Sequence, residues 1–333
     1  MITIIQVAKE AGVSVATVSR VLHDSPLVTE KTKIIVKKVI DELKYEPNMI
    51  GRNLRFSETR IILTLLSNIA NPFFSEIVHG VHHIATKNNY NVLVCERDKI
   101  TKGSGDYFDL LKQKLVDGMI VLDPAMEPAV DLEKLQDIAE RYPVVQCCEY
   151  YPDVKAPYVS IDNLVASKEA VHYLVSIGCR KIGLVNYNEK LIFSRLRKQG
   201  YLEILSEYNL DYRETYVVES GLTFENGQKA ADYFLSLENK PDALFVVADL
   251  FAIGMLKVFK EKGLRVPQDI KIIGFDNINF SEWCNPSLTT VSQPTFEIGC
   301  KAAEVLIDRI NKKSKIASVI LDHELILRES TSI

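Results

Sequence analysis

Short apolar runs that alternate with longer amphipathic stretches constrain the fold of this chain more than any other feature of its sequence. Seven runs have the length and composition of strands: IILTLLSNI (61–69), NVLVCE (91–96), GMIVLD (118–123), PVVQCCE (143–149), KIGLVN (181–186), ALFVVAD (243–249) and IKIIGFDN (270–277). Stretches of about 10 to 20 residues with helical periodicity separate them, which predicts an α/β fold. Because the runs are almost continuously apolar, we expect parallel sheets that helices cover on both faces. Seven or more such units are more than one sheet of ordinary size would hold, so we expect two similar, doubly wound subdomains.

Aromatic and charged residues follow several of these runs. Open parallel sheets bind ligands beyond the carboxyl ends of their strands, where such residues would gather. The candidates are Phe73 and Phe74 in NPFF, Asp162 in VSIDN, Arg197 in FSRLRKQGY, Asp249 in VVADL and Asp276 in GFDN. Together they predict a pocket for a small polar ligand. For Asp162 and Asp249, the alternative is a carboxylate that caps the N-terminus of a helix.

The first 45 residues predict three short helices instead of a sheet. Apolar residues recur at helical spacing from Ile4 to Ala11, and Gly12 permits a tight turn. Ser14 can cap a second helix and Thr29 a third. The residues expected to face a shared core are Val18, Val21 and Leu22 of the second helix and Ile35, Val36, Val39, Ile40 and Leu43 of the third.

The outward face of the second helix is small and carries one long cation. We expect this face to consist of Val15, Ala16, Ser19 and Arg20. Such a helix can enter the major groove of DNA as the recognition helix of a helix-turn-helix. The hydroxyls that could hydrogen-bond phosphates are those of Ser14, Thr17 and Ser19. The alternative is that the three helices are only a folding unit.

The charge distribution permits nucleic-acid contact at one end of the chain. Residues 1–55 contain nine Lys and Arg against six Asp and Glu, whereas the remainder contains 31 against 38. The segment YEPNMIGRNLR (45–55) then predicts a short helix after Pro47 that Gly51 weakens. We expect this helix to form only when it packs against something, such as DNA and a second copy of itself.

Residues 3–55 closely resemble the DNA-binding head and hinge of the LacI/GalR family of bacterial repressors. The matching motifs are AGVS-x-x-TVSRVL, the YxPN step and the R-x-L hinge. The resemblance implies that Val15, Ala16 and Arg20 read bases, that Asn48 and Arg52 also contact DNA, and that Leu54 wedges into the minor groove. Most members of the family have Ala where this chain has Gly51.

The body resembles the effector domain of the same family, through GLRVPQDIKIIGFDN, NPSLTTVSQP and LILREST. This implies a periplasmic-binding-protein-like fold of two subdomains joined by three crossovers. It also implies effector contacts at Phe73, Phe74, Arg197 and Asp276, and at a further aromatic residue, Phe224. The expected domains are a DNA-binding domain (1–46), a hinge helix and linker (47–58) and an effector-binding and dimerisation domain (59–333). The subdomains of the last are expected at about 59–160 with 293–320, and at about 161–292 with 321–333.

The effector is expected to be a nucleoside or a sugar. The motifs GRNLR, SETR, NPFFSEI and FEIG are similar to those of a nucleoside-responsive subgroup of the family. A nucleoside would present ribose hydroxyls to Arg197 and Asp276 and a flat base to a phenylalanine, but plain sugars would use the same charged groups. Sugar-binding members often have Asn-Asp where this chain has Ala248-Asp249.

These features together predict a transcriptional regulator: a repressor that binds a pseudo-palindromic operator in double-stranded DNA as a homodimer and is controlled by a small-molecule effector. We expect no enzymatic activity and no cofactor, since GSGDYF (103–108) lacks the third glycine of a dinucleotide site. We expect no membrane contact, since no stretch of the sequence approaches the ~20 apolar residues that a membrane span requires. The rival is an exported solute-binding receptor with the same body fold. The N-terminal MITIIQVAKEAG does not have the pattern of a signal peptide, so we expect a cytoplasmic location.

Cysteine and histidine spacing gives no strong sign of a metal site. The six cysteines form no CxxC pair and are expected to be buried free thiols: Cys95, Cys147, Cys148, Cys179, Cys284 and Cys300. His79, His82 and His83 have a spacing that could bind metal, but no acidic or cysteine ligand nearby completes the site. We therefore interpret them as one helix face, which the resemblance places near a dimer interface.

Overall fold

The computed structural model describes residues 2–22, 24–45, 58–96, 107–122, 129–313 and 317–332. The chain divides into two compact units, Met1–Glu58 and Thr59–Ile333. The first unit contains three helices, α1 (Ile4–Glu10), α2 (Val15–Leu22) and α3 (Glu30–Leu43). Thr3 and Thr29 cap α1 and α3, and Gly12 adopts a φ of +66° in the turn between α1 and α2. This conformation costs a glycine little, which explains its place in the turn.

The three helices enclose a small core, as predicted. Val7, Val18, Val21 and Val36 are almost completely buried in it. The prediction for Ile35 is wrong: its side chain is 43% exposed, because the inward stripe of α3 begins one position later, at Val36. Val15 was expected to face outward, but it is half-buried and packs against the core.

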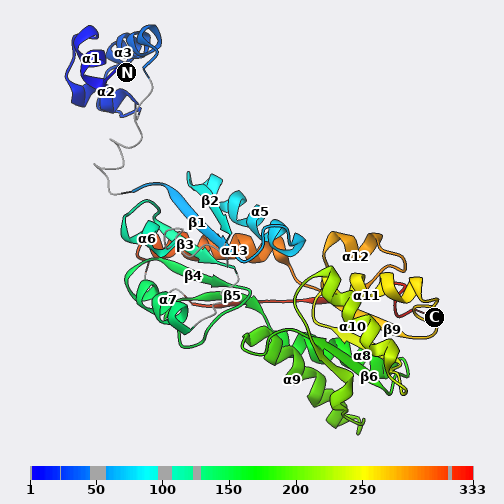
Figure 1. The fold of residues 1–333 in the computed structure, drawn as a ribbon. Coiled ribbons are helices and arrows are strands. Elements are labelled where there is room, and N and C mark those ends of the chain that lie inside the picture. Colours follow the sequence, from blue (N-terminus) through cyan, green and yellow to red (C-terminus); the bar gives the residue numbers. More distant parts are fainter. Residues whose placement is uncertain are drawn as a thin grey trace. The chain divides into compact units, whose positions relative to one another are not determined.

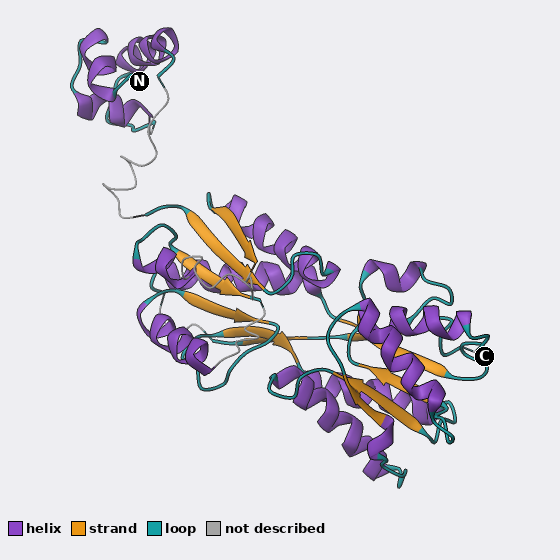
Figure 2. Ribbon diagram, in the orientation of Figure 1, coloured by secondary structure: helices purple, strands orange, loops and turns teal. Residues whose placement is uncertain are grey.

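The second unit contains two six-stranded sheets (Figures 1 and 2). The first has the order β11-β5-β4-β3-β1-β2, and all its pairings are parallel. Its strands are β1 (Ile61–Leu66), β2 (Asn91–Glu96), β3 (Gly118–Val121), β4 (Val144–Cys147), β5 (Tyr158–Ile161) and β11 (Val319–Leu321). Its helices are α5 (Pro72–Lys87), α6 (Tyr107–Lys112), α7 (Ala129–Arg141) and α13 (Thr295–Ile310).

The second sheet has the order β12-β10-β9-β8-β6-β7 and is parallel except for the antiparallel pair β10–β12. Its strands are β6 (Ile182–Asn186), β7 (Val217–Glu219), β8 (Ala243–Val246), β9 (Lys271–Asp276), β10 (Thr289–Ser292) and β12 (Glu324–Ile326). Its helices are α8 (Asn163–Ser176), α9 (Ile192–Glu207), the 3₁₀ turn η1 (Glu214–Tyr216), α10 (Phe224–Ser236), α11 (Asp249–Glu261) and α12 (Asn279–Trp283).

Helices cover both faces of each sheet, as the apolar strands predicted. In β1, Leu63 and Leu65 belong to one buried cluster and Ile62 and Leu66 to another, so both faces of the strand are in core. Helices α5 and α13 lie in close contact. A Cβ on Gly80 would fall 2.1 Å from the carbonyl oxygen of Phe296, so this approach requires a glycine. The α/β fold with two sheets is thereby confirmed.

The chain passes between the two sheets at three places (Figure 1). It does so from β5 to α8, from β10 to α13 and from β11 to β12. All seven predicted strands are present, but the sequence reading did not identify β5, β7, β10, β11 and β12. Each of these five has only three or four residues, and none lies in an apolar run as long as those that mark the equally short β3, β4 and β8.

Candidate functional site

A pocket lies between residues that follow the strands of both sheets. From the first sheet it is lined by Asn71, Phe73, Phe74, Leu122, Cys148 and Glu149. From the second sheet it is lined by Phe193, Arg197, Leu222, Val247, Ala248, Leu250, Asp276 and Gln293. The structure therefore brings together four of the predicted effector residues: Phe73, Phe74, Arg197 and Asp276.

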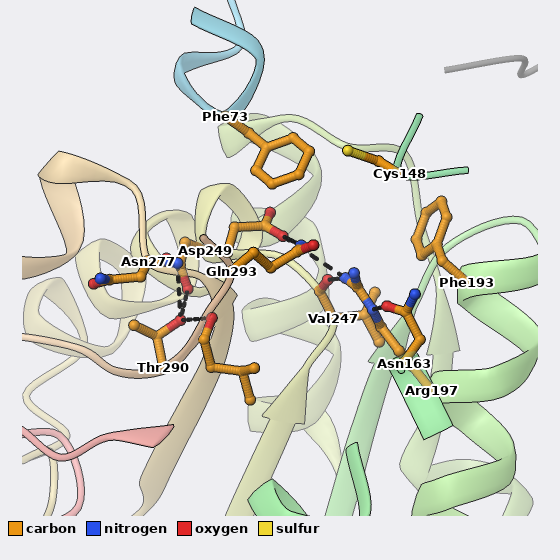
Figure 3. A network of polar contacts seen from close by, with 12 residues as sticks. Phe73, Cys148, Asn163, Phe193, Arg197, Val247, Asp249, Asn277, Thr290 and Gln293 are labelled. Carbon is orange, nitrogen blue, oxygen red and sulfur yellow. Dashed lines mark hydrogen bonds and ion pairs between the residues drawn. The ribbon is translucent and has the colours of Figure 1, made fainter. Parts of the chain in front are cut away.

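Arg197 of α9 is held rigidly in the pocket (Figure 3). Its Nε donates to Asn163 Oδ1 at 2.9 Å, and its Nη1 donates to the carbonyl oxygen of Val247 at 2.6 Å. Its guanidinium carbon lies 3.4 Å from the ring centre of Phe275 and 4.8 Å from that of Phe193. Burial lowers the pKa of Arg197 to about 10, so the side chain is still a cation at neutral pH.

Asp276 ends β9 beside this cation. Its Oδ1 lies 3.8 Å from Arg197 Nη1 and accepts a hydrogen bond from Gln293 Nε2 at 2.8 Å. Burial raises the pKa of Asp276 to about 8, and the charge of Arg197 opposes this rise. The backbone is strained here, since Asp276 has a φ of +113° and Asn277 a φ of +54°. Strain of this kind persists where the surrounding structure enforces it, often at binding sites.

Asp249 does not line the pocket. Its carboxylate accepts hydrogen bonds from Ile278 N at 3.0 Å, Ser281 Oγ at 2.6 Å and Thr290 Oγ1 at 2.6 Å. Burial raises its pKa to about 6, although these three donors favour the charged form. Asp249 thus ties α11 to β10 and to the turn after Asp276, so it supports the pocket from behind (Figure 3).

Asp162 and Phe224 also lie outside the set of pocket-lining residues. Asp162 caps α8 by accepting hydrogen bonds from the N–H groups of Leu164 and Val165, which is the alternative considered for it above. Phe224 begins α10, and its side chain is 39% exposed.

Glu149 connects the two sides of the pocket. It follows β4 of the first sheet, yet its Oε1 and Oε2 accept hydrogen bonds from the N–H groups of Ile192 and Phe193 at 2.6 and 3.0 Å. These groups begin α9, whose N-cap residue, Leu191, makes no side-chain cap. A carboxylate from one side thereby caps a helix of the other, where the helix dipole favours negative charge.

Several pocket residues were not predicted from the sequence, among them Phe193, Cys148, Glu149 and Gln293. Phe193 precedes Arg197 by four residues, and this spacing on a helix could have identified it. Gln293 follows β10, a short strand whose position was not predicted.

In the first unit, the small outward face of α2 is only partly as predicted. Ala16 and Arg20 are exposed, whereas Thr17 and Ser19 are half-buried. Ser14 Oγ accepts a hydrogen bond from the N–H of Thr17 at 3.1 Å, so it caps α2. The predicted DNA contacts Asn48, Arg52 and Leu54, and with them the hinge helix, lie outside the described residues.

The histidine group forms a helix face, as interpreted above. The rings of His79 and His83 pack against Phe296 of α13, with centroids 5.2 and 5.6 Å away. Over the described ranges, we find no group of three or more His, Cys, Asp or Glu side chains suited to a metal ion. Over the same ranges, none of the helices has the length and apolar character needed to span a membrane.

Comparison with known proteins identifies both units. Residues 3–48 match the family of bacterial regulatory proteins of the lacI type, and residues 171–331 match the periplasmic binding protein-like domain. The chain is 36% identical to the HTH-type transcriptional repressor CytR of Escherichia coli K12, over 99% of this chain and 96% of that protein. It is 34% identical to the catabolite control protein A of Priestia megaterium, over 99% of both.

Solved structures give the same answer. The Lac repressor dimer bound to operator and an anti-inducer superimposes with a TM-score of 0.88 at 25% identity, over 99% of both chains. A LacI family regulator from Enterococcus faecium with bound ribose has a TM-score of 0.72 at 27% identity, over 82% of this chain and 98% of that chain. The relatives named include repressors of transcription, as the sequence predicted. This chain belongs to the LacI family of bacterial regulatory proteins and is a DNA-binding transcriptional regulator.

Proposed function

We propose that this regulator is a repressor that binds a nucleoside in the pocket between its two sheets, and that the nucleoside controls its affinity for an operator. The observation that carries this proposal is the placement of the Arg197 guanidinium and the Asp276 carboxyl group beside the rings of Phe73 and Phe193 in one pocket. A nucleoside combines a diol with a flat base and would use both kinds of group.

Arg197 and Asp276 together suit the ribose. Arg197 can donate hydrogen bonds and Asp276 can accept them, so two neighbouring hydroxyls could each find a partner. The distance of 3.8 Å between Arg197 Nη1 and Asp276 Oδ1 is longer than a close ion pair, so hydroxyls would compete with a weak contact. The bound ribose in the Enterococcus faecium relative supports this assignment, since ribose is the sugar of a nucleoside.

The aromatic residues suit the base. Phe73 and Phe74 stand with ring centroids 5.4 Å apart, and Phe193 approaches the pocket from α9 (Figure 3). Stacking of a base on an aromatic ring is worth about 1–3 kcal/mol. A plain sugar is the second candidate, and it would leave these rings without a flat partner.

A ligand screen tests the proposal. The full-length protein is titrated with purine and pyrimidine nucleosides, the free bases, ribose and hexoses by calorimetry, and each hit is added to an operator-binding assay. We expect a nucleoside to bind more tightly than ribose or its base, and to change operator affinity. Asp276→Asn should weaken binding, whereas the exposed Asp232→Asn should not. Tightest binding of a hexose would overturn the nucleoside assignment.

We further propose that the first unit reads the operator as part of a homodimer in the cytoplasm. Domain boundaries follow the sequence prediction: a DNA-binding domain (1–46), a hinge (47–58) and a body (59–333). Base contacts are assigned to Val15, Ala16 and Arg20, phosphate contacts to Ser14, Thr17 and Ser19, and hinge contacts to Asn48, Arg52 and Leu54. The exposure of Ala16 and Arg20 on α2 supports the first of these assignments.

Selection from random duplex DNA tests this second proposal. We expect a pseudo-palindrome, because two copies of one recognition helix read two half-sites. Arg20→Ala should cost about 1–3 kcal/mol and relax preference at one position in each half-site. Lys38→Ala, on the exposed side of α3, should leave base preference unchanged. Recovery of one asymmetric half-site would refute the dimer.

A further inference from the structure

Two adjacent cysteines lie at the end of β4, where the strand meets the pocket. Cys147 is the last residue of the strand and is fully buried, while Cys148 lines the pocket. Successive side chains of an extended strand point to opposite faces of the sheet. Cys148 instead has a φ of +67°, and its Sγ lies 3.8 Å from that of Cys147. The left-handed residue therefore brings two neighbouring thiols together.

The two thiols have different surroundings. The sulfur of Cys148 faces the same space as Phe73 and Phe193 (Figure 3). The Arg197 guanidinium is close enough to interact electrostatically with Cys148, and a nearby cation favours the reactive thiolate. Cys147 lies behind it in the core of the unit. A small molecule in the pocket thus meets Cys148 first.

The remaining cysteines provide a contrast. Cys95 lies on β2 and Cys300 on α13, whereas Cys179 and Cys284 lie in the loops after α8 and α12. Burial raises the pKa of each of these four thiols, that of Cys179 to about 11. A raised pKa lowers the thiolate fraction at neutral pH and slows oxidation.

We propose that Cys147 and Cys148 form a reversible redox site in the wall of the pocket, with a hydroperoxide as the oxidant. The Cys148 thiolate attacks one oxygen of hydrogen peroxide, the O–O bond breaks, and Cys148 becomes a sulfenic acid while hydroxide leaves. The Cys147 sulfur then attacks the Cys148 sulfur, loses its proton and displaces the oxygen as water. In sum, two thiols lose two electrons and one peroxide yields two waters.

The disulfide would alter the pocket. An S–S bond of about 2.05 Å is much shorter than the present separation of 3.8 Å, so at least one sulfur must move. Movement of the Cys148 sulfur changes the wall opposite Arg197. We therefore expect oxidation to change nucleoside affinity severalfold; this consequence, unlike the chemistry, rests on the proposed function.

The chemistry is tested on the full-length protein with a small excess of hydrogen peroxide. Intact mass should fall by about 2 Da, two of the six free thiols should disappear, and one peptide containing both Cys147 and Cys148 should carry the link. Dithiothreitol should restore both thiols. Retention of all six thiols, or a link between two chains, would overturn the proposal.

Variants separate the two roles. Cys147→Ser should stop the reaction at a sulfenic acid on Cys148, which dimedone traps, while Cys148→Ser should slow oxidation of Cys147 at least tenfold. Cys179→Ser should react as the unaltered protein does. If Cys148→Ser were oxidised just as quickly, the assignment of Cys148 as the attacking thiol would be refuted. Should a serine variant fail to fold, alkylation of the unaltered native protein by iodoacetamide decides the order, since Cys148 must be labelled before Cys147.

Nucleoside titration of the reduced and oxidised forms completes the experiment. A changed affinity supports the coupling, and an equal affinity overturns it without touching the thiol chemistry. If neither form bound a nucleoside while the disulfide formed, the proposed function would fail and the redox site would stand.

Discussion

The two walls of the pocket offer a ligand different chemistry. Among the described lining residues, the wall from the first sheet has one carboxylate, that of Glu149, and both its oxygens accept hydrogen bonds from N–H groups of α9. The wall from the second sheet presents Arg197 and Asp276, with Gln293 beside them. The first wall contributes the rings of Phe73 and Phe74, and Phe193 adds a third ring from the second wall. The pair Arg197 and Asp276 therefore belongs to one wall, whereas the aromatic rings come from both.

The second wall is also better fixed before a ligand arrives. Arg197 is held by Asn163 and by the carbonyl of Val247, and the turn after Asp276 is held by Asp249. Preorganised polar groups lose less freedom on binding, so they favour one orientation of the ligand. The difference between the walls suggests that a ligand is oriented on the second wall and covered by the first.

The largest effect is expected for Arg197→Ala, which removes the cation of the second wall. Loss of a buried charged donor from a binding site costs about 2–5 kcal/mol, so effector affinity should fall about 30-fold or more. Loss of the hydrogen bonds to Asn163 and Val247 should also decrease the free energy of unfolding. Calorimetry and thermal unfolding measure the two quantities. Arg195→Ala, exposed on the same helix, is the matched control and should change neither. Retention of normal affinity by Arg197→Ala would remove the polar role of the second wall.

A smaller effect is expected for Phe73→Ala on the first wall. Lost stacking should weaken a nucleoside about 10-fold, within the range of about 1–3 kcal/mol per stacked base, and should weaken free ribose much less. Phe224→Ala is the matched control, since Phe224 does not line the pocket. Equal losses for nucleoside and ribose would show that the first wall does not select the base.

The sequence predicted the charged wall more fully than its supports. Asp276 ends the apolar strand β9, Arg197 lies on the helix that follows β6, and both belong to motifs of the family, so both were identified. Asp249 has the same kind of position, but its carboxylate turns into the core, where Ser281 and Thr290 donate to it. A position after a strand predicts nearness to the pocket but not the direction of a side chain, which depends on partners 32 and 41 residues away.

For the first wall, the sequence predicted the aromatic rings but not two other residues of the pocket. Phe73 and Phe74 were predicted, whereas Glu149 and Cys148 were not, although PVVQCCE was identified as a strand. Their roles depend on contacts across the pocket and on the positive φ of Cys148, and neither leaves a periodic pattern in the sequence. The error at Ile35 has a similar origin, since a shift of one residue rotates a helix face by about 100°.

The pH dependence of binding tests whether Asp276, on the second wall, is the group that releases a proton when the ligand binds. Burial holds the pKa of Asp276 at about 8 in the free pocket, so near neutral pH the carboxyl is mostly protonated. Ligand hydroxyls that donate to the carboxylate lower this pKa, so binding releases a proton and affinity should rise with pH through about 8. We expect an increase of about tenfold between pH 6.5 and pH 8.5, measured by calorimetry. In Asp276→Asn this increase should vanish; an unchanged increase would assign the proton to another group.

The smallest effect is expected for Glu149→Gln, which tests the contact between the walls. The side chain of glutamine is neutral and has one acceptor oxygen in place of two. It can therefore replace only one of the two hydrogen bonds from Ile192 and Phe193, and it brings no negative charge to the start of α9. Loss of an N-terminal cap costs about 0.5–2 kcal/mol. This cap joins the first wall to a helix of the second. Its loss should therefore destabilise the arrangement in which both walls enclose the ligand, and nucleoside affinity should fall about threefold to tenfold.

Asp162→Asn is the control for this last variant, since Asp162 caps α8 within its own segment. It should lower the melting temperature slightly and leave nucleoside affinity unchanged. If Glu149→Gln behaved in the same way, with lower stability and full affinity, Glu149 would stabilise only α9, and its contact would have no part in ligand binding. If affinity falls while the melting temperature of the free protein changes little, then the free protein already spends most of its time with this contact broken. The ligand, by holding Arg197 and Phe73 together, would then restore the contact, and the strength of this cap would set how readily the pocket closes.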